Sequence, residues 1–70
     1  MFLVIELQVN DGTMSTLSYQ FDDINLAYQQ YYSILSSASV SKVDIHSAIL
    51  VNEFGAVIKN DSFDHRTQEE

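Results

Sequence analysis

The clearest structural signal in the chain is residues 2–12, which read FLVIELQVNDG. The odd positions of this run are aliphatic up to Val9, and a period of about two is typical of a β-strand. Asn10, Asp11 and Gly12 follow, and these residue types tolerate the positive φ angles of tight hairpin turns. The segment therefore predicts a strand, a turn and a second strand over residues 13–21.

A helix is expected after the second strand. Asp22 or Asp23 can cap its N-terminus, because a carboxylate accepts hydrogen bonds from unpaired amide groups and meets the positive end of the helix dipole. Apolar residues then recur at spacings of three and four, which is typical of an amphipathic helix. The serine-rich run 36–41 breaks this pattern, so the helix should fray there. The residues expected to face the core are Ile24, Ala27, Tyr28, Tyr31, Ile34, Leu35 and Ala38.

Alternation returns over residues 43–52 and predicts a third strand. A turn that ends at Gly55 should lead into a short fourth strand over residues 56–59. We therefore expect a two-layer α+β fold in the order ββαββ, with one helix on a four-stranded, mostly antiparallel sheet. Residues 1–60 would form this single domain, and residues 61–70 a polar C-terminal tail.

One helix can cover only one face of such a sheet. The residues expected beneath it are Leu3, Ile5, Leu7, Val9, Leu17, Tyr19, Phe21, Val43, Ile45, Ile49 and Val51. The other face would then carry a second apolar patch, which normally marks an interaction surface. A bulge or a shifted register is the alternative, since either returns some of these side chains to the core. The expected oligomer interface is Phe2, Val4, Met14, Ala48 and Leu50.

Composition also points to self-association. A chain of 70 residues has a marginal core, and without cysteine it has no disulfide to strengthen it. Oligomerisation is the remaining means of stabilising so small a domain. Ten acidic residues against three basic ones give a net charge of −7, which disfavours binding to the phosphate backbone of a nucleic acid.

The same sequence gives expectations about location. The N-terminal segment lacks the basic region and the long apolar region of a signal peptide. No run approaches the roughly 20 apolar residues that cross a bilayer, and an acidic surface is repelled by anionic lipid. We expect a cytoplasmic protein that does not bind membranes.

Candidate catalytic and metal-binding residues are few. Asp44 and His46 lie two positions apart on the expected third strand, so they share a face. A serine-based triad would also need an oxyanion hole and a pocket, and no nucleophile-elbow motif is present. His46 and His65 are too far apart in sequence to form a local pair of metal ligands. We therefore expect no enzymatic activity, no cofactor and no metal.

A small anionic ligand is the remaining possibility for a binding site. The chain has only three cations, so such a site must draw on them or on backbone N–H groups. The serine-rich turn and the residues that follow it are the best local candidate for holding a phosphate or a ribose, with a solvated connection as the alternative. Tyr32 falls off the apolar arc of the helix and is available for stacking. The expected ligand-binding residues are Tyr32, Ser41, Lys42, His46 and Arg66.

Three parts of the chain carry a family resemblance: residues 21–23, residues 32–48, and residues 54–58 with His65 before an acidic tail. In these parts the chain resembles short uncharacterised proteins of phages and prophages from gut Firmicutes. None of these motifs is diagnostic of an activity, so the resemblance assigns no site residues. It implies a small phage product made in the cytoplasm of a host bacterium.

Together these expectations favour a non-enzymatic, homo-oligomeric phage binding protein. Its ligand would be a nucleotide-derived immune signal, sequestered at a subunit interface as a counter-defence. One alternative is an acidic interaction protein that inhibits a host protein by imitating the charge of a nucleic acid. Another is a virion accessory or assembly protein, for which oligomerisation is itself the function.

Overall fold

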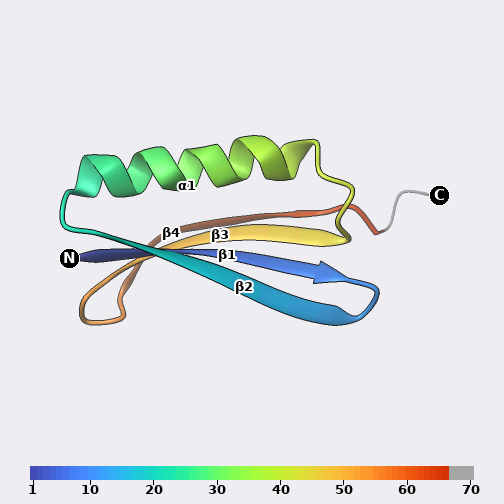
Figure 1. The fold of residues 1–70 in the computed structure, drawn as a ribbon, viewed down its shortest axis with the longest axis horizontal. Helices are drawn as coiled ribbons and strands as arrows, with labels where there is room; N and C mark the ends of the chain where they lie inside the picture. The colour runs from blue at the N-terminus through green and yellow to red at the C-terminus, as the bar shows by residue number, and fades with distance from the viewer. Residues whose placement is uncertain (67–70) are drawn as a thin grey trace.

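The computed structural model describes residues 1–66 and contains one helix packed on one sheet (Figure 1). The elements, in chain order, are β1 (Phe2–Asn10), β2 (Thr13–Phe21), α1 (Ile24–Ser39), β3 (Ile45–Asn52) and β4 (Val57–Asp64). The sheet has the order β2-β1-β3-β4, and every neighbouring pair is antiparallel. The expected α+β fold in ββαββ order is therefore confirmed.

The first turn forms as the sequence predicts. Asp11 has a φ of 55° and Gly12 a φ of 76°, so both residues of the loop are in the left-handed region. Asn10 then pairs with Thr13, and the ladder runs without interruption to the pair of Phe2 with Phe21. Two-residue loops of this kind match the natural twist of antiparallel strands.

The helix also agrees with its prediction. Asp23 caps it, because its Oδ1 accepts a hydrogen bond of 2.8 Å from the backbone N–H of Asn25. At the other end, the carbonyl of Ala38 accepts hydrogen bonds from the Ser41 amide at 3.2 Å and the His65 ring Nε2–H at 3.0 Å. The seven apolar residues expected on the inner face are all buried or packed against the core.

The side of the sheet that α1 covers is not the expected one. Val4, Ala48 and Leu50 are completely buried, and Phe2 packs against them beneath the helix. These four residues are part of this chain's own core, so their prediction as an oligomer interface is wrong. Met14, the fifth predicted residue, pairs with Val9 on the opposite side and is 64% exposed.

The physical reason for this difference is the register of the first hairpin. Because Asn10 pairs with Thr13, even-numbered residues of β1 lie opposite odd-numbered residues of β2. Tyr19 and Phe21 therefore share a side with Val4 and Phe2, and directly opposite residues point to the same face. The sequence prediction assigns the odd-numbered residues of both strands to the same face of the sheet, and a two-residue turn does not allow this arrangement.

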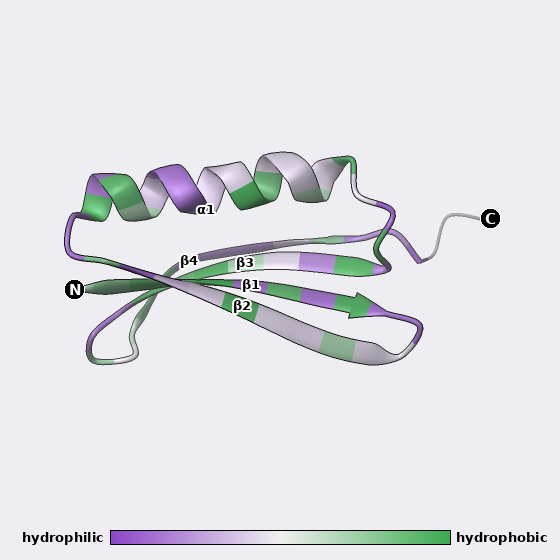
Figure 2. Cartoon of the chain, in the orientation of Figure 1, coloured by the Kyte–Doolittle hydropathy of each residue, from purple (hydrophilic) through white to green (hydrophobic). Residues whose placement is uncertain are grey.

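The other side of the sheet, which we name the open face, carries most of the residues that were expected under the helix. Figure 2 shows that β1 and β3, the two central strands, hold most of the sheet's hydrophobic colour. No element among residues 1–66 packs on this side, as the layers in Figure 1 show. The apolar residues at the centre of the open face are Leu3, Ile5, Leu7, Val9, Ile45, Ile49 and Val51.

The fourth strand is longer than expected. β4 runs from Val57 to Asp64, so residues 61–64 belong to the sheet and the predicted boundary of the tail at residue 61 is wrong. The strand is polar, and it is held by its ladder with β3, which pairs Ala48 with Asp61 and Ile45 with Asp64. Residues 67–70 of the predicted tail lie outside the described residues.

Candidate interaction surface: the open face of the sheet

The open face has an apolar centre and a polar rim. Its central side chains come from β1 and β3, where Ile5 pairs directly with Ile49 and Leu3 with Val51. Each is only partly buried, because its neighbours on the same face shield it and no second layer lies over it among residues 1–66. The rim comes from the edge strands and is mostly polar. Its polar residues are Thr16, Ser18 and Gln20 on β2 with Asn60, Ser62 and Asp64 on β4, and its apolar residues are Met14 on β2 and Val57, which pairs with Val51, on β4.

Charge is almost absent from the open face. The register places Glu6 and Asp61 on the helix side of the sheet, and most of the other acidic residues lie in turns or loops. Asp64 is the one charged residue of the rim within the described chain, and Arg66 neutralises it. A surface with this distribution is suited to contact another apolar surface.

The pair of Asp64 and Arg66 is bidentate. The Nε–H and an Nη2–H of Arg66 donate to the two carboxylate oxygens at 2.9 Å each, and the Arg66 amide donates at 3.0 Å. These hydrogen bonds lower the pKa of Asp64 from 3.8 to about 2, since they favour the charged carboxylate. The rim therefore keeps its one carboxylate charged and paired near neutral pH.

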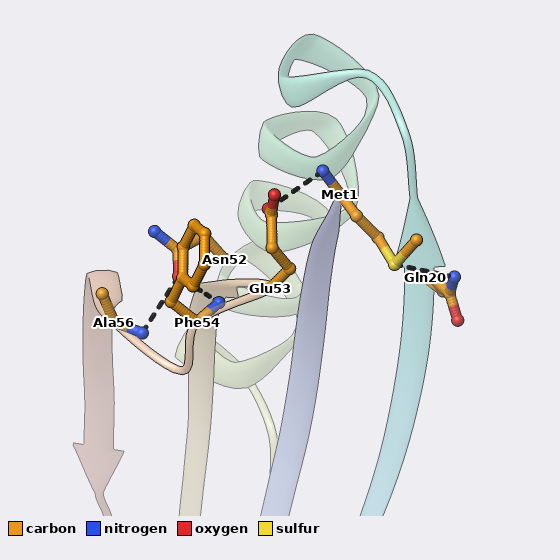
Figure 3. Close-up of polar contacts among 6 residues, drawn as sticks. All are labelled: Met1, Gln20, Asn52, Glu53, Phe54 and Ala56. Carbon is orange, nitrogen blue, oxygen red and sulfur yellow. Dashed lines mark hydrogen bonds and ion pairs between the residues drawn. The ribbon is translucent and has the colours of Figure 1, made fainter.

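A shallow pocket of about 230 Å³ lies where the open face meets one end of the sheet, and its lining includes Leu3, Gln20 and Val51. Figure 3 shows the polar contacts beside it: the Met1 ammonium group lies 3.2 Å from a Glu53 oxygen, and the Gln20 amide donates to the Met1 sulfur at 3.3 Å. A backbone N–H and the ammonium group hold the pKa of Glu53 below its usual value. This pocket extends the apolar surface and is not a separate site.

A polar cluster lies on the opposite side of the sheet, between strands and helix. The His46 ring Nε2–H donates to Glu6 Oε2 at 2.7 Å, and the Gln8 amide donates to the same oxygen at 3.0 Å. His46 is 4% exposed, and its Nδ1 is buried without a partner among the described residues. His46 forms its hydrogen bond with Glu6 and does not pair with Asp44. The Asp44 carboxylate instead accepts a hydrogen bond from the Asp11 amide.

A hydrogen bond between the layers joins the helix to β4. Tyr31 is completely buried, and its hydroxyl donates to Asp61 Oδ2 at 2.8 Å. Burial raises the pKa of Tyr31, and the hydrogen bond to Asp61 raises it further. The predicted difference between Tyr31 on the inner arc and Tyr32 outside it is confirmed, because Tyr32 is 51% exposed.

The five predicted ligand-binding residues do not form one site. Ser41, Lys42 and Arg66 lie at the C-terminal end of α1, where His65, next to Arg66, bonds to the carbonyl of Ala38. Tyr32 lies further back along the helix and packs against Tyr28 and Tyr31. His46 is buried in its pair with Glu6, and the guanidinium of Arg66 binds Asp64.

Two further features were sought among residues 1–66: a cluster of metal ligands and a helix able to cross a membrane. Within residues 1–66, no three His, Asp or Glu side chains converge to hold a metal ion. Over the same residues, no helix has both the length and the apolar character needed to cross a membrane.

The sequence prediction missed Glu6 and the true residues of the second apolar surface. The signal for the surface was present in the two-residue turn, because a loop of Asp11 and Gly12 determines which residues of β1 and β2 share a face. Nothing in the spacing of Glu6 and His46 marks them as partners, since they are 40 residues apart.

Comparison with known proteins places the chain in no family: no family model, curated protein or solved structure matches it. The resemblance to phage proteins stays a prediction from the sequence.

Proposed function

We propose that this chain is a non-enzymatic interaction protein that works as a homo-oligomer, with the open faces of two copies packed against each other. The observation that carries the proposal is the aliphatic centre of the open face, in which Ile5 and Ile49 pair side by side on the two central strands. Apolar side chains so arranged lose their contact with water when a second sheet covers them, which stabilises the assembly.

A second copy fits this face better than a partner selected by charge. The chain has a net charge of −7, yet among residues 1–66 the open face carries one charged residue, Asp64, which is paired with Arg66. A cationic partner would gain little electrostatic attraction from this face, whereas an identical apolar face is complementary to it about a twofold axis. Two acidic chains can approach in this way because, among residues 1–66, the carboxylates other than Asp64 lie on the helix side of the sheet or in turns and loops.

The area of the face is close to what a dimer requires. Four strands about 4.8 Å apart, each of about eight residues, span a surface of about 500 Å² per copy, and side chains add to it. Stable interfaces bury roughly 1,200–2,000 Å² in total. The open face alone therefore approaches the lower end of that range.

Self-association through the open face requires no catalytic site. Glu6 and His46 form a buried carboxylate and imidazole pair, in which the side chains are 14% and 5% exposed. A substrate would have little access to either group. The five residues predicted to bind a nucleotide do not support such a site, because the His46 ring is buried in its pair with Glu6 and the Arg66 guanidinium binds Asp64.

Light scattering on purified protein tests the proposal. The expected mass is at least twice the 8.0 kDa of one chain at tens of micromolar. Ile5→Lys places a charge at the centre of the open face and should reduce the mass to that of one chain while circular dichroism remains that of a folded protein. Ser33→Lys makes the same change of charge on the exposed side of α1 and should leave the mass of the assembly unchanged.

If Ile5→Lys does not fold, Ile5→Thr retains the branched side chain that suits a strand and weakens the interface less severely. A folded wild-type chain that remains at 8.0 kDa would contradict the proposal. So would an assembly that survives both substitutions of Ile5, because its contact surface would then lie elsewhere.

A further inference from the structure

The outer edge of β2 is a second surface whose hydrogen-bonding groups are not satisfied within the described chain. β2 covers residues 13–21, and among residues 1–66 it pairs only with β1. An edge strand presents alternate N–H and C=O groups to solvent, and these form a template for another extended chain. Figure 1 shows that the hairpin of β1 and β2 diverges from α1 toward its tip, so the helix does not cover this edge.

The two edges of the sheet differ in how well they are protected. β4 has an irregular register against β3 at Leu50 and Val51, and it carries Lys59 and Asp61. Bulges and charged residues of this kind discourage a further strand from pairing. β2 has none of these features: its nine residues contain no charge and no proline, and its ladder with β1 is unbroken.

Acidic residues stand at both ends of this uncharged strand. Asp11 precedes it, and Asp44 lies at the same end, because the Asp44 carboxylate accepts a hydrogen bond of 3.1 Å from the Asp11 amide. Asp22 and Asp23 follow the other end, where Asp23 is held in place as the cap of α1. Nine residues of strand separate the two acidic ends by about 30 Å.

This charge pattern argues against a second copy at the β2 edge. In an antiparallel pair centred on Leu17, Asp11 of one copy would lie opposite Asp23 of the other at both ends. A parallel pair would place equivalent carboxylates together. Like charges opposite each other destabilise strand pairing, whereas Lys or Arg at these positions would stabilise it.

We propose that β2 binds an extended segment of another protein as a fifth strand of the sheet. The segment is uncharged over the nine residues that pair and has Lys or Arg at each end. Main-chain hydrogen bonds provide the attachment, and side-chain pockets provide selectivity, as in other cases of strand addition. Here a pocket of about 240 Å³ on the helix side, lined by Glu6, Gln8, Ser15, Thr16 and Leu17, offers a place for a side chain of the segment.

The test uses two synthetic peptides, each with nine alternating Thr and Val residues. One has two lysines at each end and the other has two glutamates. Each is titrated into the isotope-labelled full-length protein, and the backbone amide signals are followed by nuclear magnetic resonance. The lysine peptide should shift the amides of β2, and its dissociation constant should rise as salt is added. The glutamate peptide should bind at least tenfold more weakly.

Two controls separate strand addition from general attraction of charges. N-methylation of alternate residues along one edge of the lysine peptide should abolish binding, while methylation of the other alternate set should preserve it, because only one set of N–H groups faces β2. The triple variant Asp11→Asn, Asp22→Asn and Asp23→Asn should bind the lysine peptide at least about threefold more weakly. Asparagine tolerates the positive φ of residue 11 and still caps a helix at residue 23, so the variant should fold.

Equal binding of the two charged peptides would overturn the proposal, as would equal effects of the two methylation patterns. Absence of any shift in the β2 amides at millimolar peptide, or evidence that the free chain pairs with itself through β2, would also overturn it. Methyl signals of Ile5 and Ile49 report on the open face separately, so this result does not depend on whether the chain is a homo-oligomer.

Discussion

At the scale of single residues, one partly buried hydrogen bond joins the helix to the sheet, and another joins two strands within the sheet. Tyr31 ties α1 to β4 through Asp61, and His46 ties β3 to β1 through Glu6. A hydrogen bond between protein groups contributes modestly to stability, but leaving a buried partner unpaired is costly. These contacts specify how the helix and the strands align more than they add to the total stability.

Tyr31→Phe should lower the free energy of unfolding by about 1 kcal/mol, because it removes the hydroxyl that donates to Asp61. Urea denaturation at pH 7 measures the loss. Tyr32→Phe is the matched control, since Tyr32 is 51% exposed and should change stability little. Equal losses in the two variants would show that the bond to Asp61 contributes nothing.

The raised pKa of Tyr31 also predicts a dependence on alkaline pH. Folding favours the protonated hydroxyl, so its stabilising contribution is present below the usual tyrosine value of 10.0 and is lost as the pH rises above it. Denaturation curves of the wild type should therefore shift to lower urea between pH 9 and pH 11, and Tyr31→Phe should show a smaller shift. Parallel behaviour of the two proteins would contradict this assignment.

The Asp64 carboxyl should respond to removal of its partner. Its pKa of about 2 lies below the ordinary 3.8 because Arg66 donates hydrogen bonds to the charged form. The stabilisation is therefore present above pH 3.8 and disappears as the pH falls toward 2. Arg66→Gln removes the side-chain hydrogen bonds, whereas the backbone N–H of residue 66 can still donate to Asp64. A titration of the Asp64 carboxyl carbon by nuclear magnetic resonance should therefore return a pKa above 2 and below 3.8. An unchanged titration would mean that other groups lower this pKa.

At the scale of elements, the local signals in the sequence were sufficient for the hairpin and the helix. Asp11 and Gly12 tolerate the positive φ angles that a tight turn requires, and Asp23 caps the helix where its chemistry predicts. The last half of β4 could not be predicted in this way, because residues 60–62 are polar and pair through their backbone with β3. A polar segment shows no hydrophobic periodicity, so only its neighbour makes it a strand.

Substitutions at two neighbouring residues of β3 should differ in how their effect on stability depends on protein concentration. Leu50 is completely buried beneath α1, so Leu50→Ala should lower the free energy of unfolding by about 2–5 kcal/mol at any protein concentration. Ile49 lies on the open face, so the effect of Ile49→Ala should be small in dilute protein and should increase with concentration. Thermal melts across a hundredfold range of concentration compare the two. The reverse pattern would mean that the sides of the sheet are wrongly assigned.

In its overall shape the protein is an elongated two-layer structure of 42 × 20 × 16 Å, and among residues 1–66 a helix covers one side of the sheet only. That a second apolar surface must exist followed from counting one helix against two faces of a sheet. The residues that compose it depend on whether odd- or even-numbered residues of β1 share a face with those of β2, which the length of the first turn determines. The sequence prediction assigns Val4 and Leu50 to this surface, whereas the structure places Ile5 and Ile49 there. The burial of His46, which removes it from the predicted ligand site, was not predictable, because it results from packing between distant segments.

An isotope-filtered nuclear Overhauser experiment on a mixture of labelled and unlabelled chains tests whether the open face of one copy covers that of another. If it does, cross-peaks between copies should arise from the methyl groups of Ile5, Leu7 and Ile49, and none from Leu50, which is buried within its own chain. Absence of cross-peaks from the open face, together with line broadening of those methyl groups by a soluble paramagnetic probe, would contradict it.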